Sequence, residues 1–293
     1  MTVSPGRWIH RKVALEKKIY SQAELDRAPL EHYGQSWEFS QATQPDADYL
    51  WVPHACRYNL YSFEDFRACT RHNQYNFLFI GSSIERLYWN DLSQFAGINY
   101  TLYKETGFAT NGNNETRISF YYYWQLIKNS CAMQAEEERA LEQLIARNGT
   151  ANTVIVMSIG IAEVHYCPRS AVVHNMAVLK RVLPRHKGPV VWISPPAVID
   201  WRISQYTRRF QTQNARWLVI SSKRMTQFYD DWKAATMSLP SSLGLIDSFQ
   251  MMASRWDATL DGIHPYHPTS FHGGPTSKWA MMLLLNILCE ESP

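Results

Sequence analysis

The chain has 293 residues, of which 45% are hydrophobic and 19% are charged. Such a composition supports a globular protein with a real core, and it excludes a disordered tail, a collagen-like fibre and a low-complexity scaffold. The formal net charge of +3 comes from 29 basic and 26 acidic residues spread along the chain. Because no basic patch stands out, we expect no nucleic-acid partner.

The hydropathy pattern of the chain predicts neither a membrane span nor a leader. Its longest apolar run, from Trp279 to Leu288, is interrupted by Asn286 and is shorter than the roughly 20 residues that a span needs. Residues 1–20 are polar and basic, unlike a signal peptide. We therefore expect either a cytosolic protein or a chain that lacks a leader or anchor present in the full gene product.

Strands and helices are expected to alternate along most of the chain. Residues 1–49 are polar with few apolar runs, so we expect an arm that packs on one main domain over residues 50–293. Apolar runs bounded by Gly or Pro predict buried strands, and helical spacing of apolar residues predicts helices. In chain order, we expect a strand at 77–80, helices at about 84–92 and 136–147, a strand at 153–157, a helix at 168–183, a strand at 189–193, a helix at 221–237, a strand at 243–247 and a helix at 276–288. This alternation predicts a three-layer α/β fold, with a mostly parallel central sheet and helices on both faces.

The first predicted strand leads directly into a turn with two serines, Ser82 and Ser83, after Gly81. In a parallel sheet, active residues lie just past the carboxyl ends of the strands. A serine there also lies at a helix N-terminus, where the helix dipole and the backbone N–H groups favour developing negative charge. The turn suits a nucleophilic serine, and it equally suits a helix cap, since serine is a common N-cap residue.

A second candidate block, Asp261-Gly262-Ile263-His264, lies near the other end of the chain. An aspartate three residues before a histidine can bond one imidazole nitrogen and leave the other as a general base. The alternatives are a surface turn, in which the aspartate bonds its own backbone, and a metal site. The residues that a metal site could use are Asp257, Asp261, His264, His267 and His272.

The five cysteines lie far apart and include no Cys-x-x-Cys pair, which argues against a zinc ribbon and a thioredoxin-type site. Cys56 and Cys69 are close enough in sequence to form a bridge in an oxidising compartment. Sequons for N-glycosylation occur at Asn99, Asn114 and Asn148, and they favour a secretory route.

The two candidate blocks together resemble a known family. Gly81-Ser82-Ser83 with Arg86 is similar to the Gly-Asp-Ser-x-x-Arg block of the GDSL/SGNH-like PC-esterase family, which includes the trichome birefringence-like proteins and their fungal relatives. The block that ends at His264 is similar to the family's Asp-x-x-His. Further stretches that are similar to the family lie at 6–8, 49–69, 157–165, 208–217 and 283–289. The chain departs from the family at Ser82, where the family has Asp, and at Ser158, where it has Asn.

The resemblance implies an SGNH-hydrolase-like fold and a serine-dependent double displacement. Ser83 would attack an acyl ester, His264 would take its proton, and Asp261 would orient the imidazole. The resemblance further implies an oxyanion hole at Ser83, Gly107 or Gly112, Ser158 and Gly160, and substrate contacts at Arg86 and His165.

The same resemblance implies the partners. We expect an acyl donor and a glycan or polysaccharide acceptor, no metal and no cofactor, a monomer, and a place in the secretory pathway. The protein would then be a carbohydrate O-acetyltransferase or O-acetylesterase. Two alternatives stay open, namely an esterase on lipid or small acyl esters and a catalytically degenerate protein that only binds glycans.

Overall fold

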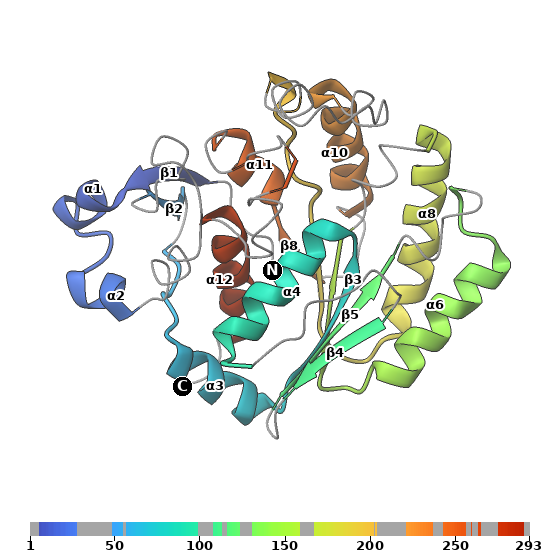
Figure 1. Ribbon diagram of the computed structural model, residues 1–293, viewed down its shortest axis with the longest axis horizontal. Helices are drawn as coiled ribbons and strands as arrows, with labels where there is room; N and C mark the ends of the chain where they lie inside the picture. The colour runs from blue at the N-terminus through green and yellow to red at the C-terminus, as the bar shows by residue number, and fades with distance from the viewer. Residues whose placement is uncertain are drawn as a thin grey trace.

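A six-stranded sheet forms the middle of the molecule, with the strand order β4-β5-β3-β6-β7-β8 (Figure 1). Five neighbouring strands are parallel, and β4 is antiparallel at the edge. The strands are β3 Asn76–Gly81, β4 Phe108–Gly112, β5 Arg117–Tyr122, β6 Thr153–Met157, β7 Val190–Ile193 and β8 Leu243–Ile246. This computed structural model describes residues 6–27, 49–54, 57–98, 108–112, 116–123, 131–158, 167–201, 203, 221–236, 243–255, 259, 263–264 and 275–289.

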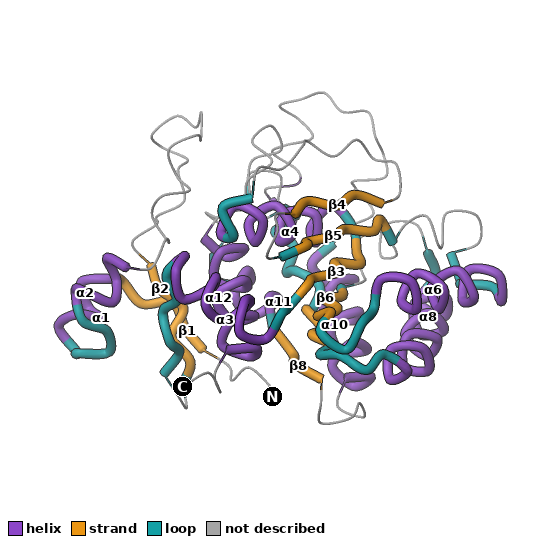
Figure 2. Tube along the Cα trace, turned by 90° about the horizontal axis from the view of Figure 1, so that it is seen from below, coloured by secondary structure: helices purple, strands orange, loops and turns teal. Residues whose placement is uncertain are grey.

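Helices cover both faces of this sheet. Figure 2 shows α4 and α12 on one side of the strands and α6, α8 and α10 on the other. The helices are α3 Phe63–Asn73, α4 Ser83–Phe95, α6 Ala135–Asn148, α8 Arg169–Val182, α10 Ser222–Thr236, α11 Ser248–Ala253 and α12 Pro275–Cys289, with a 3-10 turn at Leu183–Arg185. The three-layer α/β fold with a mostly parallel sheet is thus confirmed.

The inner strands are apolar along their whole length because both of their faces are covered. Residues Phe77–Ile80 of β3 and Val154–Met157 of β6 are almost fully buried. The closing helix α12 is buried on most of its surface as well, since it lies between α4 and the N-terminal strands β1 and β2 (Figure 1). None of the described helices is long and apolar enough to cross a membrane.

A small two-stranded ribbon packs beside α12. It pairs β1 (Gly6–His10) antiparallel with β2 (Tyr49–Pro53), and α1 (Arg11–Glu16) and α2 (Gln22–Arg27) follow β1. Trp8 of β1 donates from Nε1 to the carbonyl oxygen of Met251 at 2.8 Å, and its ring lies 6.4 Å from that of Trp279. The ribbon includes residues from both sides of the expected boundary between residues 49 and 50. This division into an arm and a main domain stays a prediction.

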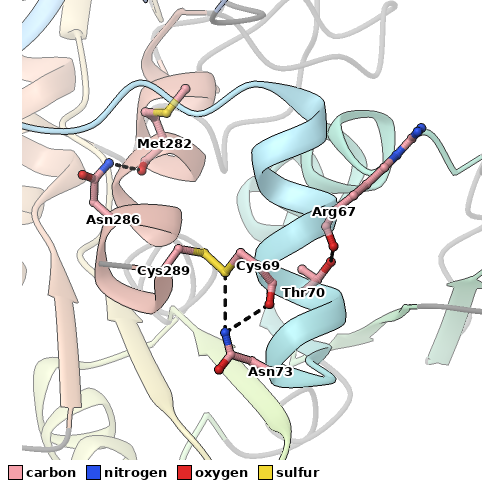
Figure 3. Close-up of a disulfide and its surroundings, with 7 residues drawn as sticks. All are labelled: Arg67, Cys69, Thr70, Asn73, Met282, Asn286 and Cys289. Atoms are coloured by element: carbon pink, nitrogen blue, oxygen red, sulfur yellow. Dashed lines mark hydrogen bonds between the residues drawn. A yellow bond between two sulfur atoms is a disulfide. The ribbon is translucent and has the colours of Figure 1, made fainter. Parts of the chain in front are cut away.

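Two disulfides join distant parts of the chain. Cys69 of α3 is bonded to Cys289, the last residue of α12 (Figure 3). Cys131 is bonded to Cys167. The bridge between Cys56 and Cys69 that their spacing allowed does not form, because α12 folds back on α3 and brings Cys289 to Cys69. Cys56 itself lies outside the described residues.

Loss of the Cys69–Cys289 bridge should cost more stability than loss of the Cys131–Cys167 bridge. The two bridges close loops of 220 and 36 residues, for which a chain-entropy treatment gives about 5 and about 4 kcal/mol. We expect the Cys69→Ser/Cys289→Ser variant to show the larger drop in the free energy of urea unfolding, with Cys131→Ser/Cys167→Ser as its control. An equal or smaller drop would contradict this expectation.

Candidate active site

Ser83 lies at the point where the strand order of the parallel sheet reverses. From β3 the chain adds β5 on one side and then β6 on the other. In such sheets ligands bind in the crevice at the carboxyl ends of the two strands where the order reverses, which here are β3 and β6. Ser83 is the first residue of α4, directly after β3, and Ser158 directly follows β6.

The turn between β3 and α4 is held by Ser82 as the N-cap residue. Its hydroxyl oxygen accepts from the N–H of Ile84 at 3.3 Å, and its carbonyl oxygen accepts from the N–H of Arg86 at 3.1 Å. The capping role left open for this turn therefore belongs to Ser82. Ser83, one residue further on, is the serine whose side chain meets the candidate base.

The structure places Ser83 Oγ 2.8 Å from Nε2 of His264. The two residues are 181 positions apart in the chain and both are partly buried. A hydroxyl within hydrogen-bond reach of an imidazole nitrogen is the arrangement that a serine nucleophile and its general base require. Asp261, the expected third member, lies outside the described residues.

Glu85 is a residue of this site that the sequence reading missed. Its side chain is only 2% exposed, and Oε2 accepts hydrogen bonds from both the backbone N–H of Ser82 and, at 2.8 Å, its hydroxyl. The side chain of Ser158 also acts on this carboxyl and lowers its pKa. A serine followed three residues later by glutamate is the pattern of a capping box, and that pattern could have pointed to Glu85.

The electrostatics beneath Ser83 follow from burial. Desolvation raises the pKa of the Glu85 carboxyl, and the hydrogen bonds from Ser82, together with the side chain of Ser158, offset part of that rise. Desolvation also raises the pKa of the Tyr88 phenol, and the nearby charge of Glu85 raises it further.

Of the other expected site residues, the structure describes Ser158, Arg86 and Gly112. Ser158 is 2% exposed and its N–H donates to the carbonyl oxygen of Ile80 at 3.2 Å, and Arg86 is 8% exposed within α4. Gly112 is paired with Arg117, which begins β5, so Gly112 lies at the opposite end of the sheet from Ser83 and cannot join the oxyanion hole. The expected residues that lie outside the described part of the chain are Gly107, Gly160, His165, Asp257, Asp261, His267 and His272.

A pocket of about 550 Å³ lies elsewhere, at the end of α12 that is remote from His264. Its lining includes Arg27, Asp65, His72 and the Cys69–Cys289 bridge, and neither Ser83 nor His264. It is therefore separate from the candidate active site.

The comparisons with known proteins assign no family. No family model matches the chain, and neither does any curated protein. Among solved structures, the chain is similar to an ADP-ribosylation-factor-like small COPII coat GTPase, Sar1, from Encephalitozoon cuniculi, crystallised with GDP. The sequence identity is 12%, the match covers 76% of this chain and 87% of the other, and the TM-score is 0.34. A likeness of that size carries no argument about fold or function.

Membership of the GDSL/SGNH-like PC-esterase family, expected from the motifs, is wrong by these comparisons, because no family model and no curated protein supports it. The motifs misled because each spans only a few residues, and the chain departs from them at Ser82 and Ser158. A function for this site therefore has to be argued from its own geometry and chemistry.

Replacement of Glu85 by glutamine tests the electrostatics of the turn. A raised pKa means that the folded protein keeps a proton that the unfolded chain releases above the ordinary value of 4.5. The contribution of Glu85 to the free energy of unfolding is therefore full below that pH and is lost as pH rises through the pKa of the folded state. We expect the wild type to lose stability relative to Glu85→Gln as pH rises from 4.5 towards neutral in urea unfolding. Parallel pH curves would show that the pKa of Glu85 is not raised.

Proposed function

We propose that the protein transfers or hydrolyses acyl groups through an acyl-serine intermediate on Ser83. The observation that carries the proposal is the 2.8 Å contact between Ser83 Oγ and His264 Nε2 at the carboxyl end of the central strand β3. A surface turn would have no need to meet a residue 181 positions away. Placement of this pair at the reversal point of the sheet adds support, because ligands bind there in sheets of this order.

The first half-reaction forms the acyl-serine. As Ser83 Oγ attacks the carbonyl carbon of an acyl ester, its proton passes to His264 Nε2 and a tetrahedral intermediate forms. The bond to the leaving oxygen then breaks, and the imidazolium returns the proton to that oxygen. An alcohol departs, and the acyl group remains on Ser83.

The second half-reaction releases the acyl group. Water or an acceptor hydroxyl gives its proton to His264 Nε2 as its oxygen attacks the acyl carbon. Collapse of the second tetrahedral intermediate returns the proton to Ser83 Oγ. Water yields a free acid, so the protein acts as an esterase, whereas an acceptor hydroxyl yields a new ester, so it acts as an acyltransferase.

The position of Ser83 also suits the charge that develops in both steps. Ser83 begins α4, and the N–H groups and the positive dipole end of a helix would favour the oxyanion that forms on the attacked carbonyl. The expected role of Asp261 in orienting His264 stays a prediction. A glycan as the acyl acceptor also stays a prediction, since it came from the family resemblance.

The Ser83→Ala variant should lose turnover of a chromogenic acetyl ester by a factor on the order of 10⁴ to 10⁶, because the attacking oxygen is gone. Ser93→Ala is the matched control. Ser93 is a buried serine of the same helix, whose hydroxyl donates to the carbonyl oxygen of Trp89 at 2.8 Å. Turnover is measured for both variants beside the wild type. Activity that survives in Ser83→Ala would refute the proposal, and so would a wild type that binds the ester without turning it over.

We also propose that the protein passes through the secretory pathway. Its two disulfides support this, because structural disulfides persist mainly in oxidising compartments. Among the sequons, Asn148 ends α6 and is partly exposed. Protein isolated from its own cells should therefore lose mass on treatment with an endoglycosidase, and fully reduced, unglycosylated protein would contradict a secretory route.

A further inference from the structure

We propose that Glu85 is a positioning residue that joins the two sides of the active-site crevice and thereby holds Ser83 in register with His264. This inference rests on the proposed function of Ser83. Glu85 acts through the turn that carries Ser83, because its carboxyl is hydrogen-bonded to Ser82.

The two sides of the crevice meet on the Glu85 carboxyl. On the side of β3, Oε2 accepts from both donors of Ser82, the residue directly before Ser83. On the side of β6, the buried side chain of Ser158, the residue directly after that strand, lowers the pKa of the same carboxyl, and the Ser158 N–H donates to the carbonyl oxygen of Ile80 at 3.2 Å. One buried group therefore links the segments that follow the two strands on which the candidate site is built.

Gly81 leaves the room that this arrangement needs. A Cβ atom at Gly81 would lie well inside contact distance of Cβ, Cγ and Oε2 of Glu85. The Glu85 side chain is therefore folded back over the end of β3, and a larger residue at 81 would displace it. A glycine is needed at position 81 because the Glu85 side chain occupies the space of a Cβ atom, and not because of an unusual backbone angle.

Comparison with two other capping boxes of the chain shows what is particular to Glu85. In α6, Glu137 accepts from the N–H of Gln134 at 3.0 Å at the same spacing, and in α3 Asp65 does so from Ser62 at 2.8 Å. Asp65 has a side chain that is 38% exposed, and Glu137 is partly exposed. Glu85 is 2% exposed and has a third partner on a neighbouring strand segment. A cap at the surface needs neither feature.

The consequence concerns the attacking atom. Displacement of a reacting group by about 1 Å can cost about 100-fold in rate. Without the Glu85 carboxyl, the buried donors of Ser82 lose their acceptor and the turn has to shift to find another. Glutamine keeps the volume, an acceptor oxygen for Ser82 and an N–H₂ group for Ser158, and it matches a neutral carboxyl.

The test uses a fluorophosphonate, which labels an activated serine whatever its natural acyl group. Ser83 Oγ bonds to phosphorus, fluoride leaves, and the serine proton passes to His264. The maximal labelling rate and the half-saturating concentration are measured on the full chain. We expect Glu85→Ala to lower the maximal rate about 100-fold with little change in half-saturation, Glu85→Gln to recover most of it, and Glu137→Ala to match the wild type.

Urea unfolding and a second substitution keep the test decisive. If Glu85→Ala does not fold, Ser158→Ala removes only the partner on the side of β6 and should lower the maximal rate about tenfold. A folded Glu85→Ala or Ser158→Ala with wild-type labelling would overturn the positioning role, and so would a Glu85→Gln variant as slow as Glu85→Ala. Labelling that persists in Ser83→Ala would instead overturn the proposed function, so the two failures are distinguishable.

Discussion

The return of α12 onto α4 is the packing on which the candidate site depends. Ser83 begins α4 and His264 precedes α12, so the packing of these two helices brings the two distant parts of the chain together. Ser277 at the start of α12 donates to Asp91 of α4 through its hydroxyl, in a buried contact. Because this contact is made in the first turn of α12, it fixes the end of the helix that is nearest to His264.

The far end of α12 is fixed by two further links. The amide of Asn286 exchanges hydrogen bonds of 2.8 and 3.0 Å with the backbone of Asn59, and Cys289 is bonded to Cys69 (Figure 3). A helix that is held along its whole length cannot slide on its neighbour. The geometry between Ser83 and His264 is thus a product of packing far from the site.

The sequence predicted β3, β6, β7 and β8 but missed β4, β5 and the ribbon of β1 and β2. The strands that were predicted are rich in apolar residues, because helices cover the sheet on both faces. By contrast, β4 lies at the edge and holds Thr110 and Asn111, and β1 pairs with β2 across a long separation that no local pattern reveals. Pairing of Cys69 with Cys289 escaped prediction for the same reason, since only the folded chain brings them together.

Within the site, the serine and the histidine could be predicted because strand ends and short motifs mark them. Glu85 could be seen only as a cap, since its burial and its link to Ser158 arise from the contact between two strands. The most direct measurement of the central claim is mass spectrometry that locates the acetyl adduct after acid quenching of a reaction with an acetyl ester. The account predicts an adduct on Ser83 that is absent from a His264→Ala variant. An adduct on another residue, or one that forms equally without His264, would contradict it.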